Sequence, residues 1–137
     1  MDLKSKIILI SGPTASGKSK FAIELAKKIN GEVINADSMQ IFKELKILTA
    51  RPQRNDLKNI KHYLYGFKSV KDNYSTGNWL KDAKKKINDI KKKNKIPILV
   101  GGTGLYFKAL IDGIVKIPDI PFTCLLYTSP SPRDNTG

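Results

Sequence analysis

The stretch GPTASGKS, residues 12–19, follows the short apolar run KIILIS (6–11) and precedes KFAIELAKKIN (20–30). Its glycines and its final Lys-Ser pair match the spacing G-x-x-x-x-G-K-[ST], which is typical of loops that bind phosphate. The glycines let successive backbone N–H groups point into one concavity at the positive end of the helix that follows. The pattern therefore predicts a strand, a loop that holds a di- or triphosphate, and a helix.

The motif predicts a role for each of the last two residues of the loop. Lys18 supplies a mobile positive charge for the outer phosphate, and the hydroxyl of Ser19 is placed to ligate Mg²⁺. The predicted diphosphate- or nucleotide-binding residues are Gly12, Pro13, Thr14, Ala15, Ser16, Gly17, Lys18 and Ser19. A phosphate site does not by itself name a reaction.

Outward from the loop, apolar runs alternate with segments of helical periodicity, which is typical of βαβ units. We expect strands at 7–11, 32–36 and 96–100, with a weaker one in HYLYGF (62–67). Helices are expected from 18 to 29, within 75–95 and within 105–113, with Asn30-Gly31 ending the first. The predicted fold is α/β: a P-loop NTPase-like parallel sheet with helices on both faces, incomplete because the chain is truncated.

Length and composition narrow the class of protein. The 137 residues suit one domain, no apolar run approaches the roughly 18 residues of a membrane span, and no secretion signal is evident. We therefore expect a cytoplasmic monomer without a membrane partner. A single cysteine, Cys124, excludes an internal disulfide and a cysteine metal cluster.

The formal net charge of +13 indicates an anionic partner, and nucleic acid is the first candidate. The charge is nearly all lysine in a chain rich in Ile and Asn, so a compositional bias explains it equally well. The lysines of residues 75–95 fit a solvated helix face better than a binding stripe.

Two features bear on the reaction. The strand IPILV (96–100) runs into GGTG (101–104), a second anion-binding loop, where nucleotide-hydrolysing enzymes usually carry a metal-binding aspartate. Asp37 follows the strand EVINA at the edge of the sheet where α/β ligand sites form. Spacing alone leaves Asp37 or Ser38 equally open as the N-cap of a helix over MQIFKEL (39–45).

The segment PFTCLLYTSPSPRDNTG (121–137) loses all periodicity from about Phe122. We interpret residues 122–137 as a non-native or disordered tail, left by sequencing-adapter read-through or cloning, and residues 1–121 as a partial P-loop catalytic domain. A native disordered tail is the alternative.

Taken together, five stretches resemble the tRNA dimethylallyltransferases, also called tRNA isopentenyltransferases. They are GPTASGKS (12–19), NADSMQIFKELKILTARP (35–52), HYLYGF (62–67), NYSTGNWLKDA (73–83) and PILVGGTGLYFKALIDG (97–113). The resemblance implies transfer of a dimethylallyl group from dimethylallyl diphosphate, with Mg²⁺, to N6 of the adenine 3′ of the anticodon in tRNA. Family members are longer, so the resemblance also implies an N-terminal fragment that is inactive alone.

The resemblance assigns roles to residues outside the first loop. It makes Asp37 the general base, and places Thr103 near the diphosphate as a second catalytic residue. Thr49 and Arg51 would lie near the diphosphate, and Gln40 would help to recognise the target base. The implied substrate-binding residues are Thr14, Ser16, Ser38, Gln40, Thr49 and Arg51. His62 is assigned no chemistry.

Three other functions remain open. A sister enzyme would prenylate free adenine nucleotides with the same loop. A small-molecule or nucleotide kinase would consume ATP, although the chain has only Arg51, Arg54 and Arg133 to form an arginine-rich lid. A basic nucleic-acid-binding remnant would bind anions without turnover.

Overall fold

The computed structural model describes residues 6–12, 18–42, 60–101, 105–115 and 123–128. Its elements are β1 (Lys6–Ser11), α1 (Lys18–Ile29), β2 (Gly31–Asn35), the short 3₁₀ helix η3 (Ser38–Gln40), β3 (His62–Tyr63), α2 (Thr76–Lys92), β4 (Ile96–Gly101), α3 (Leu105–Val115) and β5 (Thr123–Thr128). The predicted strands and the three predicted helices are confirmed.

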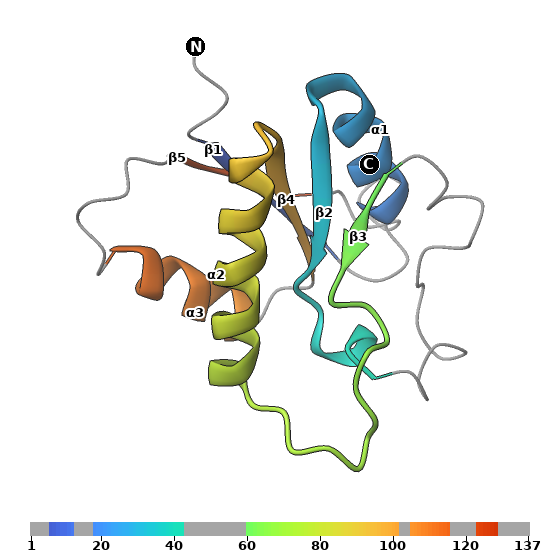
Figure 1. Cartoon of the computed structure of the whole chain (residues 1–137), viewed down its shortest axis with the longest axis vertical. Helices are drawn as coiled ribbons and strands as arrows, with labels where there is room; N and C mark the ends of the chain where they lie inside the picture. The colour runs from blue at the N-terminus through green and yellow to red at the C-terminus, as the bar shows by residue number, and fades with distance from the viewer. Residues whose placement is uncertain (1–5, 13–17, 43–59, 102–104, 116–122, 129–137) are drawn as a thin grey trace, which may run out of the picture.

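The strands form one sheet in the order β3-β2-β4-β1-β5, and every pair is parallel. Helix α1 covers one face of the sheet, whereas α2 and α3 pack together on the other (Figure 1). Because β4 lies between β1 and β2, the connection through α1 crosses over it. The α/β fold predicted from the sequence is therefore confirmed.

The two faces of the sheet are buried separately, because successive side chains of a strand point in opposite directions. On β1, Ile7 and Leu9 pack with Trp79 and Leu110 from α2 and α3. Ile8 and Ile10 pack instead with Ala22 and its neighbours on α1. This two-sided burial explains why the strands are continuous apolar runs.

Two sequence predictions differ from the structure. Residues 123–128, expected to add nothing to the fold, form β5, which pairs in register with all of β1 from Lys6↔Thr123 to Ser11↔Thr128. The reason is physical: β1 offers an unpaired edge, and TCLLYT is rich in residues that favour strands. The non-native origin of 122–137 stays a prediction.

The second difference is the helix expected over 39–45. The described part of that segment forms only the single turn η3, closed by the Gln40 N–H donating to the Asp37 carbonyl at 3.0 Å. Residues 43–45 lie outside the described residues. Asp37 thus precedes a 3₁₀ turn, and the interpretation of Asp37 or Ser38 as the N-cap of an α-helix at this place is wrong for the residues described.

The ends of α2 are held by local hydrogen bonds. Ser75 and Asn78 form a reciprocal capping box at its start. At its end Asn94 adopts a left-handed conformation (φ 61°), and Lys95 N–H donates to the Ile90 carbonyl at 3.1 Å. Of the helices that the described ranges contain, none combines the length and apolar character needed to span a bilayer.

A buried carboxylate ties β2 to its neighbours. Glu32, on β2, is 1% exposed and accepts hydrogen bonds from Tyr63 Oη at 2.8 Å and Lys93 Nζ at 2.7 Å, with Lys95 Nζ at 3.4 Å. Burial alone would raise the pKa of Glu32, but the hydrogen bonds from Lys93 and Tyr63 and the two lysine charges hold it below its usual value. This cluster links β3 and the end of α2 to the sheet.

Replacing Glu32 with glutamine should lower the free energy of unfolding at pH 7 by about 2 kcal/mol, because charge-assisted hydrogen bonds are lost. Since the folded pKa is depressed, the carboxylate stabilises the fold above its unfolded pKa of about 4.3, and this contribution is lost as the pH falls through the folded value. The deficit of Glu32→Gln should therefore shrink in acid.

Urea titrations between pH 3 and pH 7 measure this difference. Glu24→Gln is the matched control, because Glu24 is exposed on α1, and it should change the stability by less than about 0.5 kcal/mol. A deficit of Glu32→Gln that stays constant across this pH range would contradict the assignment.

Candidate diphosphate and acceptor site

The carboxyl ends of three parallel strands meet at one edge of the sheet. There the Gly12 N–H donates to the Gly101 carbonyl at 3.2 Å, and the Ala36 N–H donates to the Val100 carbonyl at 2.8 Å. These bonds bring the start of the glycine-rich loop, the residue before Asp37 and the end of β4 together. Ligands of α/β proteins bind at such an edge.

Lys18 is the first residue of α1 and is only 2% exposed. Its Nζ donates a hydrogen bond to the Gly12 carbonyl at 2.5 Å. Burial lowers its pKa, and the negative charge of Asp37 opposes that effect. A lysine ammonium has three donors, so a hydrogen bond to one carbonyl does not by itself use up its capacity to bind an anionic ligand.

Asp37 follows β2 and is positioned by Asn35. The Asn35 Oδ1 accepts from the Asp37 N–H at 2.9 Å, while its Nδ2 donates to the Asp37 and Leu64 carbonyls, both at 3.0 Å. Asn35 is fully buried, whereas Asp37 is half-buried. The backbone around Asp37 is thereby fixed and its carboxylate keeps access to solvent.

The charge of Asp37 also affects the pKa values of two tyrosines. Burial, and secondarily the Asp37 charge, raise the pKa values of Tyr65 and Tyr106. Tyr106 stacks on Trp79 with ring centroids 4.5 Å apart, and Trp79 Nε1 donates to the Asn35 carbonyl at 2.8 Å. The carboxylate of Asp37 thus lies within electrostatic reach of the buried Lys18 and of the Tyr65 and Tyr106 hydroxyls.

Gln40 ends η3, three residues after Asp37, and is 2% exposed. Its Oε1 is buried without a hydrogen-bond partner in the part of the chain that the structure describes. A buried acceptor of this kind carries an energetic cost that a donor on a ligand could relieve. The position suits the role in base recognition that the sequence resemblance implied.

The structure thus brings Gly12, Lys18, Asp37 and Gln40 to one edge of the sheet. Ser19 lies in the first turn of α1, with its side chain outside the description, and Ser38 is exposed at the start of η3. The other predicted site residues lie outside the described residues: Pro13, Thr14, Ala15, Ser16, Gly17, Thr49, Arg51 and Thr103. Sequence reasoning missed Asn35, although its place in NADS, between the strand and Asp37, was a usable signal.

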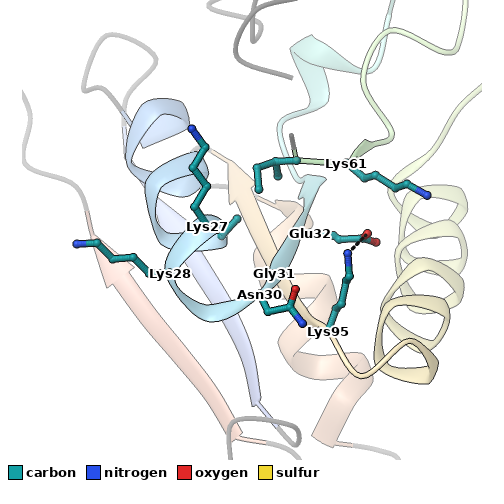
Figure 2. A pocket seen from close by; sticks show the side chains of 9 residues that line it. Lys27, Lys28, Asn30, Gly31, Glu32, Lys61 and Lys95 are labelled. Atoms are coloured by element: carbon teal, nitrogen blue, oxygen red, sulfur yellow. Dashed lines mark hydrogen bonds and ion pairs between the residues drawn. The ribbon is translucent and has the colours of Figure 1, made fainter. Parts of the chain in front are cut away.

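A cavity of about 560 Å³ lies at the opposite edge of the sheet, where β2 and β4 begin. Figure 2 shows that the ammonium groups of Lys27, Lys28 and Lys61 point away from one another, while Lys95 turns to Glu32. Because these charges do not converge, the cavity is not a preformed anion site. None of the described candidate site residues lines it.

The described ranges contain no group of three or more His, Cys, Asp or Glu side chains arranged to hold a metal ion. The fold and the site define a class: an α/β protein with a lysine at the start of the helix after a glycine-rich loop, and a carboxylate beside it. Residues 40–130 match the family model described as IPP transferase. The chain belongs to this family.

The sequences of curated relatives support the same family. A tRNA dimethylallyltransferase of Pelagibacter ubique is 69% identical over 121 residues, which are 88% of this chain and 39% of that protein. One from Rhizobium etli is 52% identical over 114 residues, covering 83% and 38% of the two chains. The chain therefore spans about two fifths of the length of these curated relatives.

Two solved structures of tRNA isopentenylpyrophosphate transferases have a fold similar to that of this chain. A tRNA isopentenylpyrophosphate transferase of Bacillus halodurans superposes with a TM-score of 0.76 at 38% identity, covering 85% of this chain and 38% of that one. The corresponding Staphylococcus epidermidis structure gives 0.73 at 43% identity, covering 77% and 35%. The fold is P-loop NTPase-like, as the sequence predicted.

Gly101 permits the close approach of β4 to the residue before Asp37. A Cβ added at Gly101 would lie 2.6 Å from the carbonyl carbon of Ala36, which is backbone and cannot move aside cheaply. Gly101→Ala should therefore destabilise the fold by about 1–3 kcal/mol and displace Asp37.

Thermal unfolding with calorimetry measures the stability. The control is Gly77→Ala in α2, where the nearest atom to the added Cβ is Ser75 Oγ at 3.7 Å. Alanine should be neutral there or stabilise by up to about 1 kcal/mol. Equal stability of the two variants would show that the fold does not require the close contact between Gly101 and the Ala36 backbone.

Proposed function

We propose that this protein, as a cytoplasmic monomer, transfers a dimethylallyl group from dimethylallyl diphosphate to N6 of the adenine 3′ of the anticodon in tRNA. The family supports a transferase, and the curated relatives are named tRNA dimethylallyltransferase. A eukaryotic structural neighbour at 39% identity is a dimethylallyltransferase acting on tRNA. The observation that carries the proposal is the buried Lys18 within electrostatic reach of Asp37 at the carboxyl edge of the sheet.

Lys18 would bind the departing diphosphate. As the allylic C–O bond breaks, negative charge accumulates on the diphosphate, and a cation already held in a low-polarity site stabilises that charge without reorganisation. The bound anion also compensates the burial of the ammonium, whose pKa is lowered in the free protein. The diphosphate is thus a leaving group, and no attacking water has to be positioned.

Asp37 would take the proton released from the acceptor. The adenine amine is a weak nucleophile because its lone pair is delocalised into the ring, so a carboxylate that accepts a proton as the new N–C bond forms is useful. The bonds from Asn35 fix the position of Asp37. Gln40 Oε1, buried and without a partner among the described residues, would accept a hydrogen bond from the base.

Mg²⁺ is part of the proposal. Magnesium retains water and takes few protein ligands in addition to substrate phosphates, so the scarcity of clustered carboxylates in the described residues fits this ion. Ser19, next to Lys18, is the residue proposed to hold it. When bound, Mg²⁺ would neutralise charge on the diphosphate oxygens.

The test is transfer by a chimera, since the chain spans 39% of its relative from Pelagibacter ubique. The matching segment of this chain replaces that of the relative, and incorporation of labelled dimethylallyl into an anticodon stem-loop is measured. Asp37→Asn should lower kcat by about 10²- to 10⁴-fold, because a general base is lost, while binding of dimethylallyl diphosphate is retained.

Asp112→Asn is the control, because Asp112 is exposed on α3, and it should transfer at the parental rate. Parental turnover by Asp37→Asn would contradict the role of Asp37 as the base. Transfer to free adenosine monophosphate in preference to the stem-loop would replace the proposed acceptor by a nucleotide.

A further inference from the structure

The loop between β3 and α2 carries an exposed aromatic group beside the candidate site. Three large hydrophobic side chains in the described residues are exposed, and two of them, Phe67 (41%) and Val70 (52%), belong to this loop. The third, Ile111, lies on α3. Exposed aromatic side chains next to a ligand site often contact the ligand or a partner.

Phe67, Tyr74 and Lys68 form a compact unit, called here the aromatic platform. The rings of Phe67 and Tyr74 meet edge to face with centroids 5.4 Å apart and planes at 89°. Lys68 Nζ lies 5.6 Å from the Phe67 centroid and 5.7 Å from that of Tyr74. An exposed aromatic face and a lysine are therefore held together.

The platform is rigid because hydrogen bonds fix it on two sides. Tyr74 Oη donates to Asp82 Oδ2 on α2 at 2.7 Å. The turn between the two aromatic residues is closed by the Ser69 N–H donating to Asp72 Oδ2 at 2.8 Å and the Asp72 N–H donating to the Ser69 carbonyl at 2.9 Å. A preorganised aromatic surface loses little entropy when a ligand stacks on it.

The same loop is bonded to the segment that follows Asp37. The Gly66 N–H donates to the Gln40 carbonyl at 2.8 Å, and the Phe67 N–H donates to the Ile41 carbonyl at 3.0 Å. In Figure 1 the loop after β3 runs alongside η3, at the edge of the sheet where the strands end. The platform is thus adjacent to the residue proposed to bind the target adenine.

We propose that the aromatic platform stacks an unpaired base of the RNA substrate that neighbours the target adenine, while Lys68 contacts its phosphate. This inference rests on the proposed function. Stacking on an aromatic face combined with a nearby cation is how proteins hold single-stranded nucleic acid, because every base has a π-face and every nucleotide a charge. A purely apolar protein segment laid on Phe67 would instead bury the Lys68 ammonium at a cost.

The test measures fluorescence anisotropy of a labelled single-stranded RNA with an anticodon-loop sequence, and of an RNA duplex, titrated with the 137-residue chain. Phe67→Ala should weaken single-strand binding by about 5- to 150-fold and duplex binding by less than twofold. Phe67→Trp should retain or strengthen single-strand binding. Lys68→Ala should reduce the slope of log affinity against log salt by about 0.7.

Ile111→Ala is the matched control, because Ile111 is 42% exposed, like Phe67, but lies on α3. Equal single-strand affinity of Phe67→Ala and Ile111→Ala would overturn the proposal, as would no RNA binding by the folded chain. Tryptophan at position 67 adds a direct readout: RNA should quench its emission. Emission shielded from acrylamide and unchanged by RNA would show a protein segment on the platform instead.

Affinity for a non-reactive dimethylallyl diphosphate analogue, measured in the same variants, separates the two proposals. Phe67→Ala should leave it unchanged. Single-strand RNA binding that does not depend on Phe67, with intact analogue binding, would refute the platform alone, whereas no analogue binding by the parental chain would refute the proposed function.

Discussion

The candidate site depends on one electrostatic constraint: the Lys18 ammonium is buried beside the carboxyl end of β1, within electrostatic reach of Asp37, which follows β2. Strand β4 separates β1 from β2, and both residues lie where the chain leaves the sheet at the carboxyl ends of β1 and β2. The close fit of Gly101 against Ala36 holds the end of β4 against the residue before Asp37. Within the described residues this buried cation has a neutral carbonyl as its acceptor and a carboxylate nearby.

Hydrogen bonds of Asn35 hold the backbone around Asp37 in place. Asn35 holds both sides of the Asp37 backbone and also the loop at Leu64, and it receives the Trp79 indole hydrogen bond on its own carbonyl. One buried residue, through its side chain and its backbone carbonyl, therefore connects β2, the loop after β3 and α2. The Glu32 cluster performs a comparable function at the opposite edge of the sheet, away from the proposed chemistry.

The sequence predicted the fold and the main charges because both depend on local pattern. Apolar runs and helical spacing identified the strands and helices, and parallel pairing then placed Lys18 and Asp37 at the same edge. Strand β5 was missed because its pairing depends on the open edge of β1, which is a tertiary property. The buried Gln40 Oε1 and the aromatic platform were missed because they require the loop after β3 to return beside η3, which no spacing encodes.

The central claim is that the bound diphosphate is a leaving group. Isothermal titration of the folded chain with Mg²⁺ tests it most directly, with a non-reactive dimethylallyl diphosphate analogue and, separately, ATP. We predict tighter binding of the analogue, abolished by Lys18→Ala and retained by Lys20→Ala, whose side chain is exposed on the same helix. Tighter binding of ATP would contradict the claim and support phosphoryl transfer instead.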